Sequence, residues 1–218
     1  MLSHNILFAT LFSGNGRIAI QKNQFMSPAN SMSIGNLIIH PPLNSPIPTH
    51  EALVKKLQKM EFIGKSLDNN ASSYLAGERF LQLITFLGCS PHVRLEPEDE
   101  NDSAFTHVQI KGPFDRPHLL FGKNTRPPGC PECGHRFADW LTRFMLNDDQ
   151  SGSCPVCGSG LTLQGLQWRH QAGVANLFLM ITDIFPGEAV PLPELLQTFN
   201  EAGKDWCYFY AQEPQWIP

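Results

Sequence analysis

Apolar residues in this chain occur in short clusters separated by turn residues, and the spacing within the clusters changes along the chain. Brief or alternating clusters predict strands at 37–40, 92–96, 105–110, 118–122 and 205–211. A longer apolar stretch at 175–185 fits either a strand or a helix. We interpret it as a strand buried on both faces, because it ends in the turn residues FPGE.

Apolar residues at helical spacing predict three helices outside the cysteine-rich region. The first covers 48–60, where Thr49 is placed to cap the N-terminus. The second covers 73–88, and the third covers 191–203 with a proline near its first turn. Helices mixed with short strands predict an α+β fold, with a small mixed or antiparallel sheet and a few helices.

Composition adds limits on size, compartment and partners. The chain has 218 residues, of which 42% are apolar, and this is enough for a packed core. Sixteen Lys and Arg against twenty Asp and Glu give a formal charge of −4, which argues against a chain that is basic throughout and binds nucleic acid. No apolar run reaches the roughly 18 residues that span a membrane, so we expect a cytoplasmic protein.

The N-terminal segment differs from the rest. Its apolar patch, Ile6–Phe12, has no Lys or Arg before it and no clear cleavage site after it, which disfavours a signal peptide. We expect residues 1–31 to be a poorly ordered leader. The α+β domain is then expected over 32–218, with an insertion at about 126–168 that holds most of the cysteines.

Two Cys-x-x-Cys-Gly repeats are the most specific pattern in the chain. They read CPECG at 130–134 and CPVCG at 154–158, and twenty residues separate Cys133 from Cys154. Proline fixes φ inside a tight turn and glycine takes a positive φ after the second cysteine, so each repeat predicts a knuckle. The two knuckles together offer four soft ligands to one metal ion: Cys130, Cys133, Cys154 and Cys157.

The four-cysteine set predicts a structural zinc ion. Catalytic zinc keeps one coordination position open, whereas four cysteines fill every position. Iron is chemically possible in the same cage. A redox pair would need only one such motif, so the duplication disfavours it. The other two cysteines, Cys89 and Cys207, are expected to be buried and inert.

The segment between the two repeats predicts a short helix. Its apolar residues recur at helical spacing, at Phe137, Trp140, Leu141, Phe144 and Met145. We expect this face to pack against the knuckles or the main sheet. Six basic residues against three acidic ones give a balance of +3 over 111–143. A second hypothesis is therefore a nucleic-acid-binding module that uses three arginines, Arg126, Arg136 and Arg143.

Residues 126–168 resemble zinc-ribbon and zinc-knuckle proteins. More broadly, the segments YLAGERFLQLITFLGCSPHVRLEP, NTRPPGCPECG and FPGEAVPLPELL resemble an uncharacterised bacterial family whose members are sometimes labelled sugar transporter ATPases. The residues do not support an ATPase. In FIGKS, Gly64, Lys65 and Ser66 match a P-loop, but Lys59 stands where its first glycine should be.

These observations favour a non-enzymatic, zinc-stabilised cytoplasmic domain that binds a protein partner or serves as a scaffold. We find no catalytic motif and assign no catalytic or cofactor-binding residue. The nucleic-acid-binding module is the first alternative. The second is an enzyme with an unfamiliar site away from the zinc, which would need a pocket lined by converging polar side chains. His92, His107 and His118 on short predicted strands are interpreted as ordinary polar positions.

Overall fold

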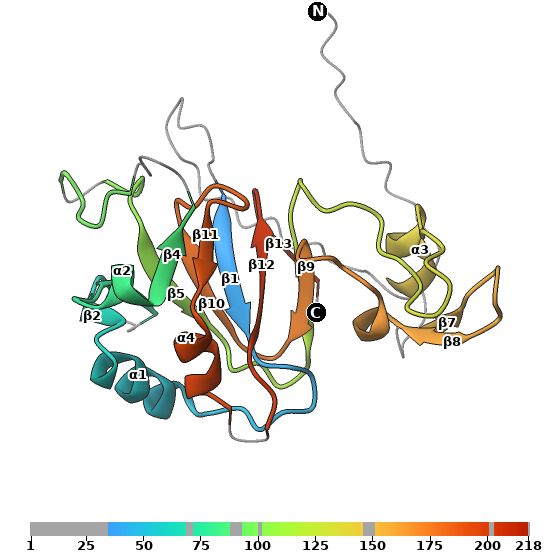
Figure 1. Cartoon of the computed structure of the whole chain (residues 1–218), viewed down its shortest axis with the longest axis horizontal. Coiled ribbons are helices and arrows are strands. Elements are labelled where there is room, and N and C mark those ends of the chain that lie inside the picture. Colours follow the sequence, from blue (N-terminus) through green and yellow to red (C-terminus); the bar gives the residue numbers. More distant parts are fainter. Residues whose placement is uncertain are drawn as a thin grey trace, which may run out of the picture.

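The computed structural model describes residues 35–68, 72–87, 93–99, 102–145, 151–200 and 203–217. The expected leader at 1–31, Cys89 and His92 lie outside these residues. The described part is an α+β structure, as the sequence predicts (Figure 1). A larger body stands beside a smaller unit, residues 126–168, that carries the cysteine repeats and is called the knuckle unit. Among the described helices, none has the length and apolar character needed to cross a membrane.

A six-stranded sheet forms the centre of the body. Its strand order is β12–β1–β10–β5–β3–β2, and every neighbouring pair is antiparallel. The strands predicted at 37–40, 105–110 and 205–211, and the buried strand within 175–185, are confirmed. The bounds are β1 Asn36–His40, β2 Ile63–Ser66, β3 Ser73–Ala76, β5 His107–Lys111, β10 Phe178–Thr182 and β12 Cys207–Ala211.

Helices cover one face of this sheet and enclose the larger core (Figure 1). Leu53 and Leu57 of α1 and Leu195 of α4 are fully buried in it. Thr49 accepts a hydrogen bond from the N–H of Ala52 at 3.2 Å, which confirms the predicted N-cap. The elements on this face are α1 His50–Lys59, α2 Phe80–Leu83, α4 Pro193–Thr198 and a two-stranded sheet of β4 Ile84–Phe86 and β11 Ala189–Pro191.

The helix predicted at 73–88 is wrong. The segment forms strand β3, the single turn α2 and strand β4 instead. Gly77 separates the first two, and a Cβ there would lie only 2.1 Å from the carbonyl oxygen of Glu61. This close approach lets the chain turn sharply after β3, so that Phe80 and Leu83 enter the core while the strands pair with distant partners.

The strand predicted at 92–96 is also wrong where the structure describes it, because 93–99 contains no strand. Arg94 organises this region instead. Its guanidinium lies 2.7 Å from Glu98 and 2.9 Å from Asp102. Asp102 also accepts hydrogen bonds from the N–H groups of Glu98 and Ala104, so the described acidic residues Glu98 and Asp102 gather around one arginine.

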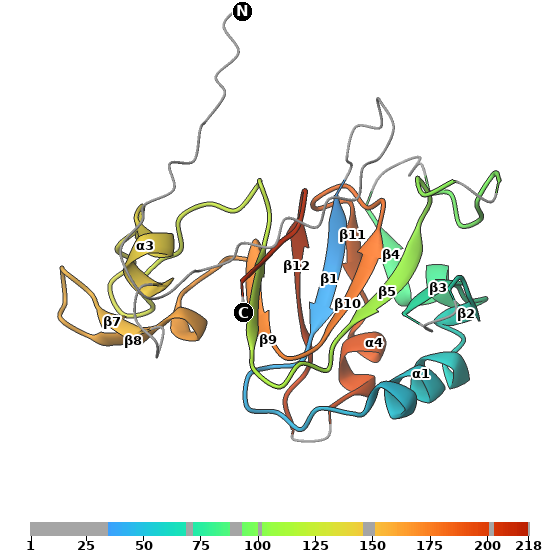
Figure 2. The ribbon, with the colours of Figure 1, turned by 180° about the vertical axis from the view of Figure 1, so that it is seen from behind.

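A three-stranded sheet covers part of the opposite face of the main sheet (Figure 2). Ile38, Phe178 and Phe209 of the main sheet pack against Leu120 and Ala175 of this second sheet. The strand predicted at 118–122 is confirmed as its central strand. The bounds are β6 His118–Phe121, β9 Ala172–Ala175 and β13 Gln215–Ile217.

His40 is a buried polar residue between the two sheets. Its ring lies against Phe178 and Phe209, with centroids 5.9 and 5.6 Å away, and its Nδ1 lies 2.9 Å from the carbonyl oxygen of Pro41. Gly173 of β9 makes room for it, because a Cβ there would lie 2.6 Å from Nε2. Burial lowers the pKa of His40 from 6.5 to about 4, so the ring is neutral at pH 7.

We expect the stability of the protein to fall as the pH decreases, in part because of His40. The unfolded chain binds a proton near pH 6.5, whereas the folded chain resists it until about pH 4. The loss between pH 7 and pH 5 is about 2 kcal/mol from this residue. Urea unfolding of the native chain and of His40→Gln at both pH values measures it. His107, whose pKa burial also lowers, is present in both proteins. An equal loss in the variant would contradict the assignment.

Candidate metal centre

Each cysteine repeat folds as a knuckle with the same hydrogen bonds. The N–H of Cys130 donates to the carbonyl of His135 at 2.8 Å, and the N–H of Gly134 donates to the carbonyl of Cys130 at 2.9 Å. The second knuckle repeats both bonds at 2.9 Å, through Cys154, Ser159 and Gly158. The two glycines have φ of +75° and +73°, the conformation that the sequence predicts after each second cysteine.

Short strands and one helix hold the two knuckles (Figure 1). The second knuckle is the tip of a hairpin, while Gly129 before the first knuckle pairs with Arg136 and with Gln167. A 3₁₀ turn follows the second strand of this hairpin. The elements are α3 Trp140–Met145, β7 Ser151–Ser153, β8 Gly160–Thr162 and the 3₁₀ helix η1 Leu163–Gly165.

The two knuckles bring all four sulfur atoms together. Each lies within 4.8 Å of the others. The Sγ atoms of Cys130 and Cys157 are 3.8 Å apart, and those of Cys133 and Cys154 are 3.6 Å apart. These distances are far longer than a disulfide of about 2.05 Å, and the four cysteines are free thiols.

The size of this cage fits a metal ion with four thiolate ligands. A zinc–sulfur bond is about 2.3 Å, so the sulfurs of a regular tetrahedron around zinc lie about 3.8 Å apart. The two measured pairs agree with this value. Cys130 and Cys154 are buried, whereas Cys133 and Cys157 are exposed, so the cage has an inner and an outer pair. The four cysteines can therefore hold one metal ion at the surface.

Hydrogen bonds around the sulfurs make the four thiols unequal. Burial opposes ionisation of Cys130, but N–H groups of the first knuckle and the hydroxyl of Ser159 outweigh it and lower its pKa to about 6. At Cys133 the N–H of His135 favours the thiolate, yet partial loss of solvent around the sulfur and the other sulfurs raise the pKa to about 12. A divalent cation would remove this repulsion and stabilise all four thiolates.

Ser159 is a residue at the site that the sequence reasoning missed. Its Oγ lies 3.0 Å from the Sγ of Cys157 and 3.6 Å from that of Cys130, and its hydrogen bond is the main reason that the pKa of Cys157 is lowered. It occupies the same place after the second knuckle as His135 after the first. An alignment of the two repeats, which places Ser159 opposite His135, could have identified Ser159 from the sequence. His135 packs its ring edge-on against Phe137 instead of approaching the sulfurs.

Aromatic residues anchor the cage to the body. Phe137 and Phe144 are buried and meet edge-to-face with centroids 5.5 Å apart, and Trp140 contacts Trp168 in the same way at 5.0 Å. The packing expected for the apolar face of the helix between the repeats is thus confirmed for Phe137, Trp140 and Phe144. Leu141 is exposed, and the side chain of Met145 lies outside the described part. The cluster also contains Cys130, Cys154 and, from the second sheet, Leu119, Phe121, Val174 and Ile217.

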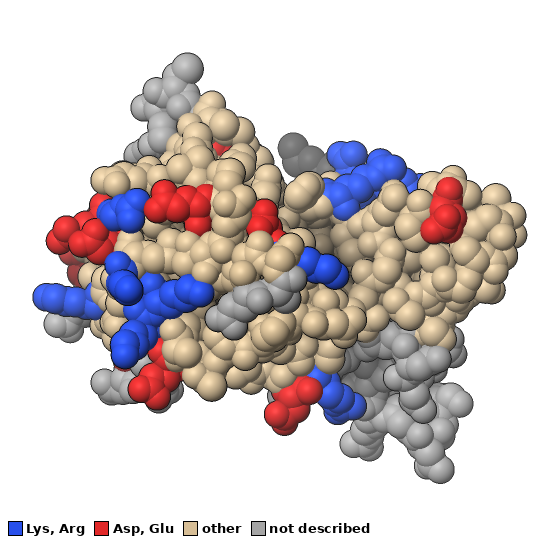
Figure 3. Space-filling model, turned by 60° about the horizontal axis from the view of Figure 1, so that its bottom comes forward, with Lys and Arg blue, Asp and Glu red and all other residues tan. Residues whose placement is uncertain are grey.

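Two of the three arginines proposed to contact nucleic acid have side-chain partners within the chain. Arg143 pairs with Asp139 at 2.8 Å, and Arg136 donates to the carbonyl oxygen of Pro127 at 2.7 Å. Arg126 is exposed. On the face shown in Figure 3, Lys and Arg gather at one margin of the knuckle unit, and most of its remaining surface is uncharged.

The other sequence candidates do not join the cysteine cage. Gly64, Lys65 and Ser66 lie on strand β2, not in a phosphate-binding loop. His107 and His118 lie on strands of different sheets, and the four cysteines are the one metal-ligand cluster found among the described residues. Cys207 is exposed, so its expected burial is wrong.

Two surface hollows bear on the enzyme alternative. One of about 450 Å³ lies beside the β7–β8 hairpin, and the residues lining it include no ionisable side chain. The other, of about 500 Å³, is lined by Leu87, Phe185, Pro186, Gly187 and Glu188. Within the described part of the chain, neither hollow offers the converging polar groups that an active site needs.

Comparison of the chain with protein families, with curated proteins and with solved structures finds no match in any of the three. The resemblances to zinc ribbons and to a bacterial family therefore remain resemblances of the quoted residues. The four converging sulfurs are the feature on which a functional assignment can be built.

Removal of the metal should unfold the knuckle unit and spare the main sheet. Trp140 and Trp168 lie in the cluster that contains two of the ligands, whereas the main-sheet core has its own buried residues. A chelator should therefore shift tryptophan emission to longer wavelength while amide exchange in β1, β5 and β10 stays slow. Loss of protection throughout the chain, or no spectral change, would contradict this division.

Substitution of Gly134 should weaken the knuckle through backbone strain alone. Its φ is +75° and a Cβ would meet no atom within 4 Å, so Gly134→Ala should cost about 1 kcal/mol, or about fivefold in metal affinity. Gly160→Ala is the matched control, because a Cβ there also meets nothing and its φ is not positive. Competition with a chromogenic chelator measures both affinities. Equal affinities would show that the positive φ is unimportant.

Proposed function

We propose that this chain is a zinc protein whose ion is structural, and that the ion holds the knuckle unit in the shape that a protein partner recognises. The main support is the group of four cysteine sulfurs, all within 4.8 Å of one another, at spacings that suit a tetrahedral ion. Four protein ligands saturate zinc and leave no position for water or substrate. The ion would then contribute folding energy, on the order of 10 kcal/mol, to the unit.

Zinc is the metal that we propose for this site. We also propose that the protein resides in a reducing compartment such as the cytoplasm. Closed four-cysteine sites are typical of structural zinc, although iron accepts the same ligands. Thiolates at 3.6 to 3.8 Å from one another would be oxidised readily without metal in an oxidising compartment. Both choices rest on the chemistry of the ligand set.

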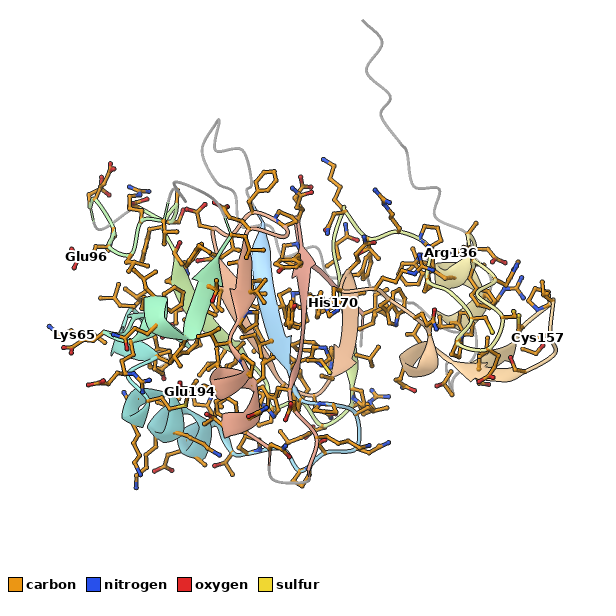
Figure 4. All side chains as sticks on the ribbon, viewed as in Figure 1. Lys65, Glu96, Arg136, Cys157, His170 and Glu194 are labelled. Carbon is orange, nitrogen blue, oxygen red and sulfur yellow. The ribbon has the colours of Figure 1, made fainter. Side chains whose placement is uncertain are left out.

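A protein is the proposed partner because of the surface that the unit presents. Cys157 lies at the end of the molecule far from the body (Figure 4). Beside it Val156 is 66% exposed, and Leu141 on α3 is also exposed. On the face shown in Figure 3, most of the described surface of the knuckle unit is uncharged. An apolar, weakly charged tip suits a protein surface better than a phosphate backbone.

The metal content tests the first half of the proposal. The purified chain, expressed with zinc and iron both available, should carry one zinc ion per chain by elemental analysis, and Cys130→Ser should carry much less. Metal-to-protein ratios near zero, or iron with the absorption of an iron–thiolate centre, would contradict a structural zinc site.

The second half is tested by changing the tip without changing the cage. Proteins that bind the native chain in extracts of its host should be lost from Val156→Ser and kept by Ile47→Ser, which changes an exposed apolar residue on the body. Circular dichroism and zinc content should be normal in both. Equal binding by the two variants would contradict recognition at the tip. Binding of RNA or DNA that weakens steeply with salt and with Arg126→Gln would favour the nucleic-acid alternative.

A further inference from the structure

A surface hollow lined in part by exposed apolar side chains lies on the body, far from the metal centre, and has no role in the function proposed above. It is formed by Leu87, which follows β4, and by the turn Phe185–Glu188, which precedes β11. Leu87 is 65% exposed and Phe185 is 53% exposed. The N–H of Leu87 donates to the carbonyl of Glu188 at 2.7 Å, so the two sides of the hollow are joined by the backbone.

The chain enters the body beside this hollow. Gly35 is the first described residue, and its carbonyl accepts a hydrogen bond from the N–H of Ile184 at 3.1 Å. A Cβ at Gly35 would lie 3.4 Å from Cδ of Pro186, which lines the hollow. The following residue, Asn36, is fixed by its pairing with Thr182. The 34 residues that precede Gly35 are therefore attached at the edge of the hollow.

Those 34 residues contain one dense apolar run. Six of the seven residues in Ile6–Phe12, ILFATLF, are apolar. Between this run and Gly35 lie 22 residues, among them several Ser, Asn and Gly. A random coil of 22 residues has a root-mean-square span of about 25 Å, which is ample to reach a site beside its own attachment point.

We propose that the run Ile6–Phe12 docks in the hollow lined by Leu87 and Phe185 of its own chain. Leu87 and Phe185 expose large apolar side chains that the apolar residues of the run can cover. Tethering gives the run an effective concentration of about a millimolar at the hollow, so a modest intrinsic affinity is enough to keep it docked. The large exposed side chains of Leu87 and Phe185 would then be covered by those of Leu7, Phe8 or Leu11. This contact does not depend on the metal.

Hydrogen exchange of the full chain tests the contact. Amides in Ile6–Phe12 should exchange about tenfold more slowly than in a free peptide of the same sequence. Phe185→Ser, and separately Phe8→Asp, should return them to within about twofold of the peptide rate. Val156→Ser removes another exposed apolar side chain, at the far end of the molecule, and should leave the protection unchanged. Slow exchange in the main sheet shows that each variant is folded.

Cross-linking identifies what covers the hollow. A photoreactive amino acid at position 185 should form bonds to Ile6–Phe12 of the same chain at all protein concentrations. Bonds between differently labelled chains, increasing with concentration, would overturn the proposal in favour of a second copy. Unprotected Ile6–Phe12 amides, or protection that appears only with lipid vesicles, would also overturn it. None of these contradicting results would change the zinc content of the protein. Failure of this proposal can therefore be distinguished from failure of the zinc site.

Discussion

Repulsion between four sulfur atoms is the constraint around which the knuckle unit is built. The sulfurs lie within 4.8 Å of one another, and the hydrogen bonds of the knuckles favour negative charge on some of them. Loss of solvent together with the neighbouring sulfurs raises the pKa of Cys133 to about 12, so the cage resists carrying four charges by itself. A cation reverses this balance, since it turns mutual repulsion into four metal–sulfur bonds that tie distant turns together.

The aromatic cluster carries this local constraint into the rest of the molecule. Cys130 and Cys154 belong to the same cluster as Phe137, Phe144 and Trp168, and the cluster continues into the second sheet. The main sheet, in contrast, has its larger core on the opposite face, under the helices. A metal ion held by these cysteines would therefore support the knuckle unit and the adjoining sheet most directly, while the main sheet has its own core.

The sequence predicted the parts of the structure that local chemistry decides. The repeats identified the four cysteines whose sulfurs lie together and the positive φ of Gly134 and Gly158, and Thr49 marked the start of α1. The segment 73–88 was misjudged because apolar spacing alone does not show that Gly77 must pass close to Glu61. Strands β9 and β13 are short, and both pair with β6. The residues of β13 lie about a hundred positions away from β6 in the sequence, so no local pattern reveals this pairing.

X-ray absorption at the zinc edge would test the central claim most directly, because it reports the atoms bound to the ion. For four cysteine ligands, the spectrum should fit four sulfur neighbours at about 2.3 Å and no nitrogen or oxygen. A first shell with fewer sulfurs and a light-atom ligand would contradict the account, since it would mean that the ion has a position open for water or substrate.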